Sequence, residues 1–248
     1  MSSRNPPEST CPDIRRARLE ARIRRQYETV CEAYHFDSLT VQLTRVAKPD
    51  EMLERMEPDV ASGAAAVPRW QPYWAELWGC SLAVCDVLVQ HDLQGVRVLD
   101  LGCGLGLTGT VAAARGALVT MVDAAPPALL FARLNSWPYR DRVQVRLLDW
   151  RRDRLAGRFP WIVGADILYD REDWPFLEAF WRAHLAPGGR VLLGEGGRST
   201  GGEFPAWLDG RGWRLDRTEL ATARHPRPFR LFQLCLDLPC HHPRTSSR

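Results

Sequence analysis

Residues 98–109 constrain the fold more than any other part of the sequence. An apolar run, Val98-Leu-Asp-Leu, leads at once into three alternating glycines, Gly102, Gly104 and Gly106, and a helix is expected directly behind them. Glycine adopts positive φ and lets a ligand approach the backbone without a Cβ in the way. The first turn of the helix offers free backbone N–H groups. This order of strand, glycine loop and helix predicts a ligand-binding turn in a βα unit.

Short apolar strands alternate with helices on both sides of this turn. We expect strands near 96–101, 118–122, 143–148, 161–165 and 190–194, and helices near 107–115, 127–137 and 174–185. Alternation at this spacing is typical of parallel βαβ units with right-handed crossovers. Two more strands, over 213–218 and 229–238, are expected to close the sheet. The chain is therefore predicted to be an α/β protein.

The first 70 residues differ from this pattern. Residues 1–12 are rich in Ser, Pro and Asn, and we expect them to be disordered. Beyond them we expect an amphipathic, arginine-rich helix from Asp13 to about Val30, a strand over 36–46, a short helix over 49–56 and a linker over 58–68. The predicted organisation is an N-terminal helix/strand extension over 13–70, a main domain over 71–238 and a frayed tail over 239–248.

Charge and composition exclude several classes of partner. The net charge is only +3, and the arginines are mixed with acids, as in Arg151-Arg152-Asp153-Arg154, so we expect no nucleic-acid partner. No apolar stretch is long enough to span a membrane, and the N-terminus lacks the apolar core of a secretory signal. We therefore expect a cytoplasmic protein with reduced cysteines. The Cys235-x₄-Cys240-His241-His242 run fits no common zinc spacing, so we expect no metal.

Acidic residues end the two strands that follow the glycine loop. Asp123 closes the strand after Gly104, where a carboxylate can accept hydrogen bonds from both ribose hydroxyls of an adenosine ligand. The alternative is a capping Asp before Ala-Ala-Pro-Pro. One strand later, Asp149 and Trp150 suit an adenine, with the carboxylate facing its amine and the indole packing on the ring. Ligands of open α/β sheets bind at the carboxyl ends of strands, so the sequence predicts an adenosine site.

The motif set resembles the class I, seven-β-strand methyltransferases that use S-adenosylmethionine. The likeness covers about residues 72–237 and includes Asp-Leu-Gly-Cys-Gly-Leu-Gly from Asp100, then Asp123, and Leu185-Ala-Pro-Gly-Gly-Arg before a strand. Within that class the chain resembles the family 16 protein-lysine methyltransferases, and most of all the electron-transfer-flavoprotein β-subunit lysine methyltransferase and its bacterial relatives. The segments that carry this closer likeness are Pro72-Tyr-Trp-Ala-Glu-Leu-Trp78, Asn135, Leu148-Asp-Trp150 and Ala165-Asp166-Ile-Leu-Tyr169.

The resemblance implies a Rossmann-like, seven-stranded, mostly parallel sheet with helices on both faces and an antiparallel last strand. It also implies that the cofactor is S-adenosylmethionine and that a protein partner supplies an acceptor lysine. The implied cofactor-binding residues are Trp78, Asp100, Gly102, Gly104, Gly106, Asp123, Asp149 and Trp150.

Asp166 and Tyr169 are the implied catalytic residues of the substrate-lysine pocket. Without the resemblance, a strand-end Asp that caps a turn and a Tyr that packs in the core explain these two residues equally well. Two alternative functions remain open from the sequence. One is a methyltransferase of the same fold that acts on a small amine or another metabolite. The other is a non-catalytic module that binds an adenosine ligand and regulates a partner.

Overall fold

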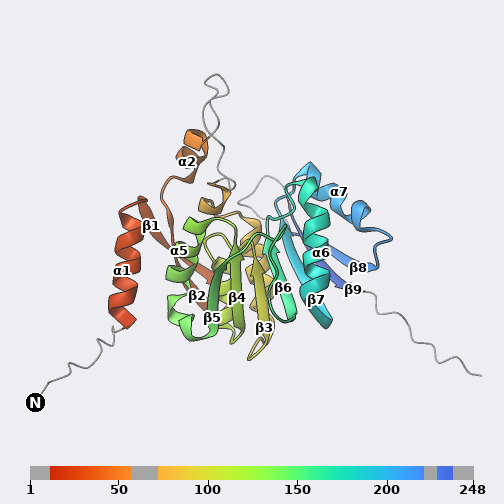
Figure 1. The fold of residues 1–248 in the computed structure, drawn as a ribbon, viewed down its shortest axis with the longest axis horizontal. Helices are drawn as coiled ribbons and strands as arrows, with labels where there is room; N and C mark the ends of the chain where they lie inside the picture. Colours follow the sequence, from red (N-terminus) through yellow and green to blue (C-terminus); the bar gives the residue numbers. More distant parts are fainter. Residues whose placement is uncertain (1–11, 57–71, 221–227, 237–248) are drawn as a thin grey trace, which may run out of the picture.

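A seven-stranded sheet forms the centre of the protein (Figure 1). The computed structural model describes residues 12–56, 72–220 and 228–236. The order of the strands across the sheet is β5-β4-β3-β6-β7-β9-β8. Their bounds are β3 Arg97–Leu101, β4 Leu118–Asp123, β5 Val143–Leu147, β6 Phe159–Ala165, β7 Leu185–Glu195, β8 Trp213–Leu220 and β9 Phe229–Leu236. The strands from β5 to β7 pair in parallel, and β9 lies antiparallel between β7 and β8. The predicted fold class is therefore confirmed.

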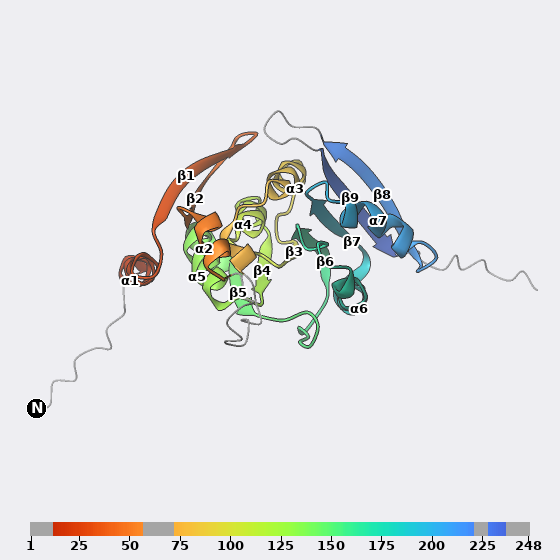
Figure 2. The same ribbon diagram turned by 90° about the horizontal axis from the view of Figure 1, so that it is seen from above.

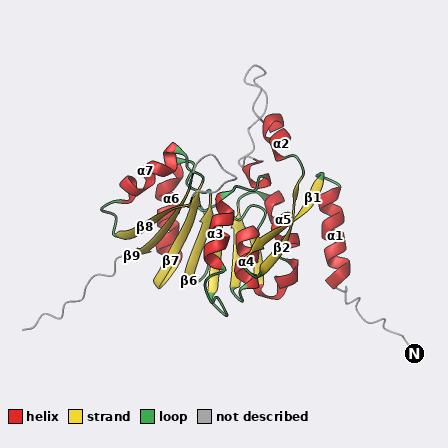
Figure 3. Ribbon diagram, turned by 180° about the vertical axis from the view of Figure 1, so that it is seen from behind, coloured by secondary structure: helices red, strands yellow, loops and turns green. Residues whose placement is uncertain are grey.

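Helices cover both faces of the sheet. One face carries α3 (Cys80–Leu88), α4 (Leu107–Ala114) and α5 (Pro126–Asn135), and the other carries α6 (Trp174–His184) and α7 (Ser199–Leu208) (Figure 3). Successive strand residues point to opposite faces of the sheet. Val98 therefore packs in the first hydrophobic core, with α3 to α5, and Leu99 packs in the second, with α6 and α7. Trp174, Phe180 and Trp181 of α6 fill much of the second core.

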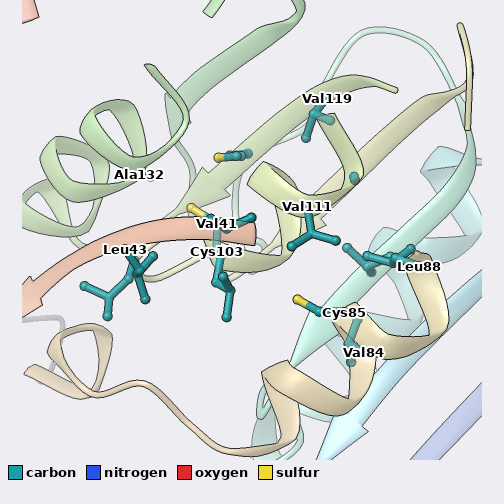
Figure 4. Close-up of a cluster of buried hydrophobic side chains, with 14 of the residues drawn as sticks. Val41, Leu43, Val84, Cys85, Leu88, Cys103, Val111, Val119 and Ala132 are labelled. Carbon is teal, nitrogen blue, oxygen red and sulfur yellow. The ribbon is translucent and has the colours of Figure 1, made fainter. Parts of the chain in front are cut away.

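The N-terminal extension packs against the first core. Here α1 (Pro12–Arg24) is followed by a hairpin of β1 (Thr29–Phe36) and β2 (Leu39–Val46), which curves along the side of the domain (Figure 2). Val41 and Leu43 of β2 lie in the same buried cluster as Cys103 of the glycine loop and Ala132 of α5 (Figure 4). Extension and main domain thus share one hydrophobic core.

Two expectations for this extension are wrong. The first helix ends at Arg24 and does not reach Val30, because residues 29–36 form a strand of their own. The single strand expected over 36–46 is the second half of a hairpin, which turns at Asp37 with φ +51°. Asp is one of the few residues other than Gly that adopt this backbone conformation readily.

Most other predicted elements are present. The helix expected over 49–56 is α2 (Pro49–Met56), and the strands and helices of the βα alternation lie within a few residues of their expected positions. A single turn, η1 (Pro72–Ala75), precedes α3, and η2 (Trp137–Arg142) and η3 (Arg171–Asp173) connect later elements. The sequence did not predict α7. The linker expected over 58–68, the tail over 239–248 and most of the expected disordered start lie outside the described residues. None of the helices in the described ranges has the length and apolar character that crossing a membrane requires.

Candidate active site

A cavity of about 810 Å³ opens at the carboxyl ends of the parallel strands. It lies beside β3 and β6, which are neighbours in the sheet although β4 and β5 lie between them in the sequence. The strand order therefore reverses at this point: β4 and β5 lie on one side of β3, and β6 and β7 lie on the other. Open α/β sheets bind ligands at such a reversal. Eight of the ten predicted site residues line the cavity: Trp78, Gly102, Gly104, Asp123, Asp149, Trp150, Asp166 and Tyr169.

The glycine loop between β3 and α4 forms one wall of this cavity. Gly102 has φ +68°, and a Cβ there would come within 2.8 Å of Ile167 Cγ2 and 3.4 Å of the Trp150 ring. Gly104 has φ +49° and lies against the backbone of Trp74. Both positions favour glycine because the backbone takes a left-handed conformation, and at Gly102 the neighbouring side chains also leave no room for a Cβ.

Asp123, the last residue of β4, holds this loop in place through hydrogen bonds. One of its carboxylate oxygens accepts a hydrogen bond from the Gly104 N–H at 2.8 Å and the other accepts one from the Ala125 N–H at 2.8 Å. Burial raises the pKa of the Asp123 carboxyl, and these two backbone bonds counteract part of that rise. The carboxylate thus ties the ends of β3 and β4 together on the wall of the cavity.

Asp149 and Trp150 follow β5 at the same edge. The Asp149 carboxylate accepts hydrogen bonds from the Arg151 N–H and the Arg152 side chain, both at 3.0 Å. The indole N–H groups of Trp150 and Trp74 are buried and have no hydrogen-bond partner among the described residues. Buried donors are normally satisfied, so Trp74 and Trp150 each bring an unsatisfied N–H group to the wall of the cavity.

Asp100 and Gly106 do not line the cavity. The Asp100 carboxylate points under the loop, where it accepts hydrogen bonds from the Thr108 hydroxyl at 3.0 Å and the Gly109 N–H at 2.8 Å. Gly106 directly precedes α4 and has φ +82°, and a Cβ there would approach Ala132 Cα to 2.8 Å. In this structure both residues shape the loop from behind: Asp100 anchors the start of α4, and Gly106 lets α4 pack on α5.

Asp166 lies directly after β6 with φ +60°, a left-handed conformation that is rare outside glycine. Its N–H donates to the Gly194 carbonyl at 2.8 Å. Its side chain is only 3% exposed, and both oxygens accept hydrogen bonds from the guanidinium of Arg198, with Nη2 to Oδ2 at 2.8 Å. Asp166 is thus half of a bidentate ion pair at the cavity wall.

Three aromatic rings surround the mouth near Asp166. The Tyr73 ring meets Tyr169 at 5.6 Å and Trp78 at 6.3 Å between centroids, both edge to face. The Trp78 indole N–H donates to the Tyr73 carbonyl at 2.9 Å. Burial, followed by the charge of Asp173, raises the pKa of Tyr169 to about 12, so its phenol stays neutral. Aromatic rings therefore line the cavity beside the buried carboxylate of Asp166.

The cavity is acidic although the chain carries a small positive net charge of +3. Its lining includes seven acidic residues, Glu76, Asp123, Asp149, Asp166, Asp170, Glu172 and Asp173, and two basic ones, Arg151 and Arg171. Burial, followed by the charge of Asp50, raises the pKa of Glu76. Some of these carboxylates are paired with arginines outside the lining, as Asp166 is with Arg198 and Asp149 with Arg152, so the excess negative charge is smaller than the count of acidic residues.

Two arginines at the site were not predicted. Arg198 pairs with Asp166, and Arg151 connects the Asp149 loop to Asp173 through a hydrogen bond from its Nε. Their sequence separations from their partners are 32 and 22 residues, so no local spacing reveals these pairs. One signal was available: Arg198 follows the carboxyl end of β7, the edge where ligands of this architecture bind.

Sequence comparison relates this region to known enzymes. A family model described as lysine methyltransferase matches residues 74–201. The chain is 38% identical over 129 residues to the protein N-lysine methyltransferase METTL21A of Danio rerio, covering 48% of this chain and 58% of that protein. It is 34% identical over 151 residues to the electron transfer flavoprotein beta subunit lysine methyltransferase of Xenopus laevis, covering 56% and 58%. The chain thus spans little more than half the length of these curated relatives.

Solved structures share the fold. The glycopeptide N-methyltransferase MtfA in complex with S-adenosyl-L-methionine has a TM-score of 0.55 at 18% identity, over 62% of this chain and 86% of that one. The N-methyltransferase NodS from Bradyrhizobium japonicum, in complex with S-adenosyl-L-homocysteine, has a TM-score of 0.56 at 17% identity, over 77% and 100%. At this level of identity the likeness concerns the architecture of the sheet and its helices.

Proposed function

The chain belongs to the lysine methyltransferase family, and on that premise we propose that it transfers a methyl group from S-adenosylmethionine to a lysine side chain of a protein. One observation carries the proposal. The Asp166 and Tyr169 pair, which follows β6, lines the same cavity as the glycine loop and Asp123. The proposed cofactor site and the proposed acceptor site therefore share one cavity.

The residues present fit S-adenosylmethionine. A cavity of about 810 Å³ lies within the range of small-molecule sites. Asp123 is proposed to bind the ribose hydroxyls, and Asp149 with Trp150 to bind the adenine. The glycine loop leaves room for the ligand against the backbone at Gly104. The unpartnered indole N–H groups of Trp74 and Trp150 support a polar ligand at this wall.

Methyl transfer from a sulfonium to an amine mainly requires that the two groups are aligned and that water is excluded. When bound, S-adenosylmethionine supplies an activated methyl carbon, to which the amine lone pair forms an N–C bond while the C–S bond breaks and S-adenosylhomocysteine leaves. The protein's task is to aim that lone pair and exclude water. Asp166 is proposed to accept an N–H of the amine, and Tyr169 with Tyr73 to enclose its aliphatic stem. The product leaves as an N-methylammonium, because the positive charge that the sulfonium loses is carried by the newly methylated nitrogen.

A lysine as the acceptor is supported by two independent features. The relatives named above are lysine methyltransferases acting on proteins. The mouth combines exposed aromatic rings, Tyr73 and Tyr169, with an acidic lining, which suits a long aliphatic chain that ends in an amine. The exposed position of these rings at the rim fits an acceptor presented by a large partner.

Incubation of the purified protein with methyl-labelled S-adenosylmethionine and cell lysate tests the proposal. We expect discrete labelled protein bands that contain Nε-methyllysine after hydrolysis. Label confined to a small molecule would support the alternative metabolite methyltransferase. No label with Asp166→Asn and wild type alike, although S-adenosylmethionine binds by calorimetry, would support the non-catalytic module. Omitting the lysate separates transfer to a partner from self-labelling.

A further inference from the structure

The Asp166–Arg198 pair raises a question about the charge of the acceptor. A lysine attacks only as a neutral amine, yet its free pKa is about 10.4. A carboxylate alone beside the amine would stabilise the ammonium and keep the lone pair occupied by a proton. In this site the carboxylate already has a permanent positive partner, because an arginine side chain is not deprotonated in proteins.

The position of Arg198 is built into the fold. Its N–H donates to Glu195 Oε1 at 2.7 Å, and its carbonyl accepts from Arg230 Nη1 at 2.7 Å. Glu195 is buried and also accepts from the Gly197 N–H and from Arg230, each at 2.9 Å. At its other end the Arg198 guanidinium lies 5.0 Å from the centroid of the Trp78 ring. Glu195 and Arg230 therefore fix the backbone of Arg198, and Asp166 and Trp78 fix its guanidinium.

We propose that Arg198 is a positioning residue that neutralises Asp166, so that the site binds the acceptor lysine as a neutral amine. This inference rests on the proposed function. Arg198 uses one hydrogen bond on each Asp166 oxygen, and a carboxylate has about four acceptor sites. The remaining sites can accept N–H groups of the amine and orient its lone pair, while the nearby guanidinium disfavours an added proton.

The surrounding ionisable groups leave this balance intact near neutral pH. Glu195, which is buried, and Arg230, which is partly buried, form their own ion pair at 2.9 Å. Burial raises the pKa of the Cys80 thiol, which faces the pair from α3, and the pKa of Tyr169 is raised to about 12. Glu76 also lies on the cavity wall, and burial raises its pKa. A carboxyl group is either neutral or negative, so Glu76 does not add a positive charge beside Asp166.

The test measures binding of N-acetyl-lysine methylamide to protein saturated with S-adenosylhomocysteine, by NMR titration between pH 7 and pH 9. If only the neutral amine binds, the apparent affinity of the wild type rises close to tenfold per pH unit, since the probe's own pKa is about 10.4. In Arg198→Met, Asp166 is left without its partner and binds the ammonium. We expect this variant to lose the rise with pH and to bind the probe about tenfold or more tightly than wild type at pH 7.

Two further variants keep the test decisive. Asp166→Asn leaves Arg198 unopposed, so the probe should bind more weakly than to wild type at pH 7, and this arm remains if Arg198→Met does not fold. Arg190→Met is the matched control, because Arg190 lies 4.8 Å from the Trp161 ring centroid in a similar contact, whereas Asp166 is paired with Arg198. It should keep the wild-type pH dependence.

The outcomes separate the two proposals. Failure of S-adenosylhomocysteine to bind the wild type would refute the cofactor assignment and with it the proposed function. If S-adenosylhomocysteine binds, but the probe shows one common pH dependence in wild type, Arg198→Met and Asp166→Asn, the role assigned to Arg198 is wrong and the methyltransferase proposal stands. A thermal unfolding curve for each variant confirms that folded protein is being compared.

Discussion

Asn135 on α5 binds both backbone polar groups of Thr44 on β2: its carboxamide oxygen accepts from the Thr44 N–H at 2.8 Å, and its nitrogen donates to the Thr44 carbonyl at 2.9 Å. The same nitrogen donates to the Leu105 carbonyl in the glycine loop at 2.9 Å. One buried side chain therefore joins the N-terminal hairpin to the loop that is proposed to bind the cofactor.

Asn135→Ala should weaken the attachment of the N-terminal hairpin to the glycine loop. Three backbone groups lose their partner, and leaving buried polar groups unsatisfied costs roughly 1–3 kcal/mol of unfolding free energy. Urea unfolding measures the loss, and hydrogen exchange should rise first in β1 and β2. The control is Ser136→Ala, which removes one hydroxyl bond to the Ala132 carbonyl within α5. Equal losses in the two variants would contradict the role given to Asn135.

Asp123→Ala should lower the affinity for S-adenosylmethionine by about 1–3 kcal/mol, because ribose hydroxyls and the Gly104 N–H lose their acceptor. Gly104→Val should bind more weakly still, since a branched residue does not adopt φ +49° and would fill the ligand's space. Calorimetry measures both, with Asp92→Ala, whose carboxylate accepts from the Gln94 N–H in a remote turn, as the control. Unchanged affinity in both site variants would remove these assignments.

Asp166→Asn should slow methyl transfer by about 10²-fold and leave the affinity for S-adenosylmethionine nearly unchanged, as expected for loss of a group that orients the acceptor. The wild-type rate should rise with pH as more of the lysine becomes neutral. Single-turnover transfer to the labelled protein substrate measures both. Asp216→Asn, on the exposed side of β8, is the control. Transfer at the wild-type rate by Asp166→Asn would leave Asp166 as a turn residue.

Tyr169→Phe should retain most of the activity. The Tyr169 ring packs edge to face on Tyr73, and its phenol, with a pKa of about 12, carries no charge at working pH. Tyr169→Ala removes the ring pair, which is worth about 0.5–1.5 kcal/mol, and should raise KM for the protein substrate. Steady-state kinetics separate the two variants. A large fall in kcat for Tyr169→Phe would instead assign a role to the hydroxyl.

Asp100→Asn should change how stability depends on pH. Burial raises the pKa of Asp100 to about 7 in the folded state, whereas an Asp in an unfolded chain titrates near ~3.9. Its contribution to stability is therefore complete below about pH 4 and is lost as the pH rises through about 7. The asparagine variant lacks this loss, so its stability relative to wild type should increase with pH across that window, by at most about 1.4 kcal/mol per unit. Urea unfolding at several pH values would contradict this if the two curves ran parallel.

Much of the fold follows from the sequence because local pattern and tertiary role agree there. The run Val98-Leu-Asp-Leu before Gly102 fixes both a strand and a turn, and the cavity forms where the parallel strands end. For the start of Thr29–Phe36 the sequence pattern predicts helix, because polar residues such as Glu32 and His35 hide the strand alternation. Pairing with β2 decides its structure.

The site was harder to predict where position depends on the tertiary structure. Asp100 belongs to the motif, yet its carboxylate points under the loop toward Thr108 and not into the cavity. Arg198 has no distinctive sequence context, and its pairing with Asp166 depends on β6 and β7 being neighbours. Sequence patterns locate the edge of the sheet where chemistry occurs, but they do not tell which side chains already bind one another there.

The position of β9 has a consequence for how the protein is made. Phe229–Leu236 is the last strand to leave the ribosome among those described, yet it lies between β7 and β8 and brings Arg230 to Glu195 and to the Arg198 carbonyl. Nascent chains emerge from the N-terminus and can begin folding before translation ends. The glycine loop can therefore assemble early, whereas the backbone that carries Arg198 gains its support only once residue 236 has cleared the exit tunnel. The hydrogen bonds from Arg230 to Glu195 and to the Arg198 carbonyl are thus among the last contacts that the growing polypeptide can form.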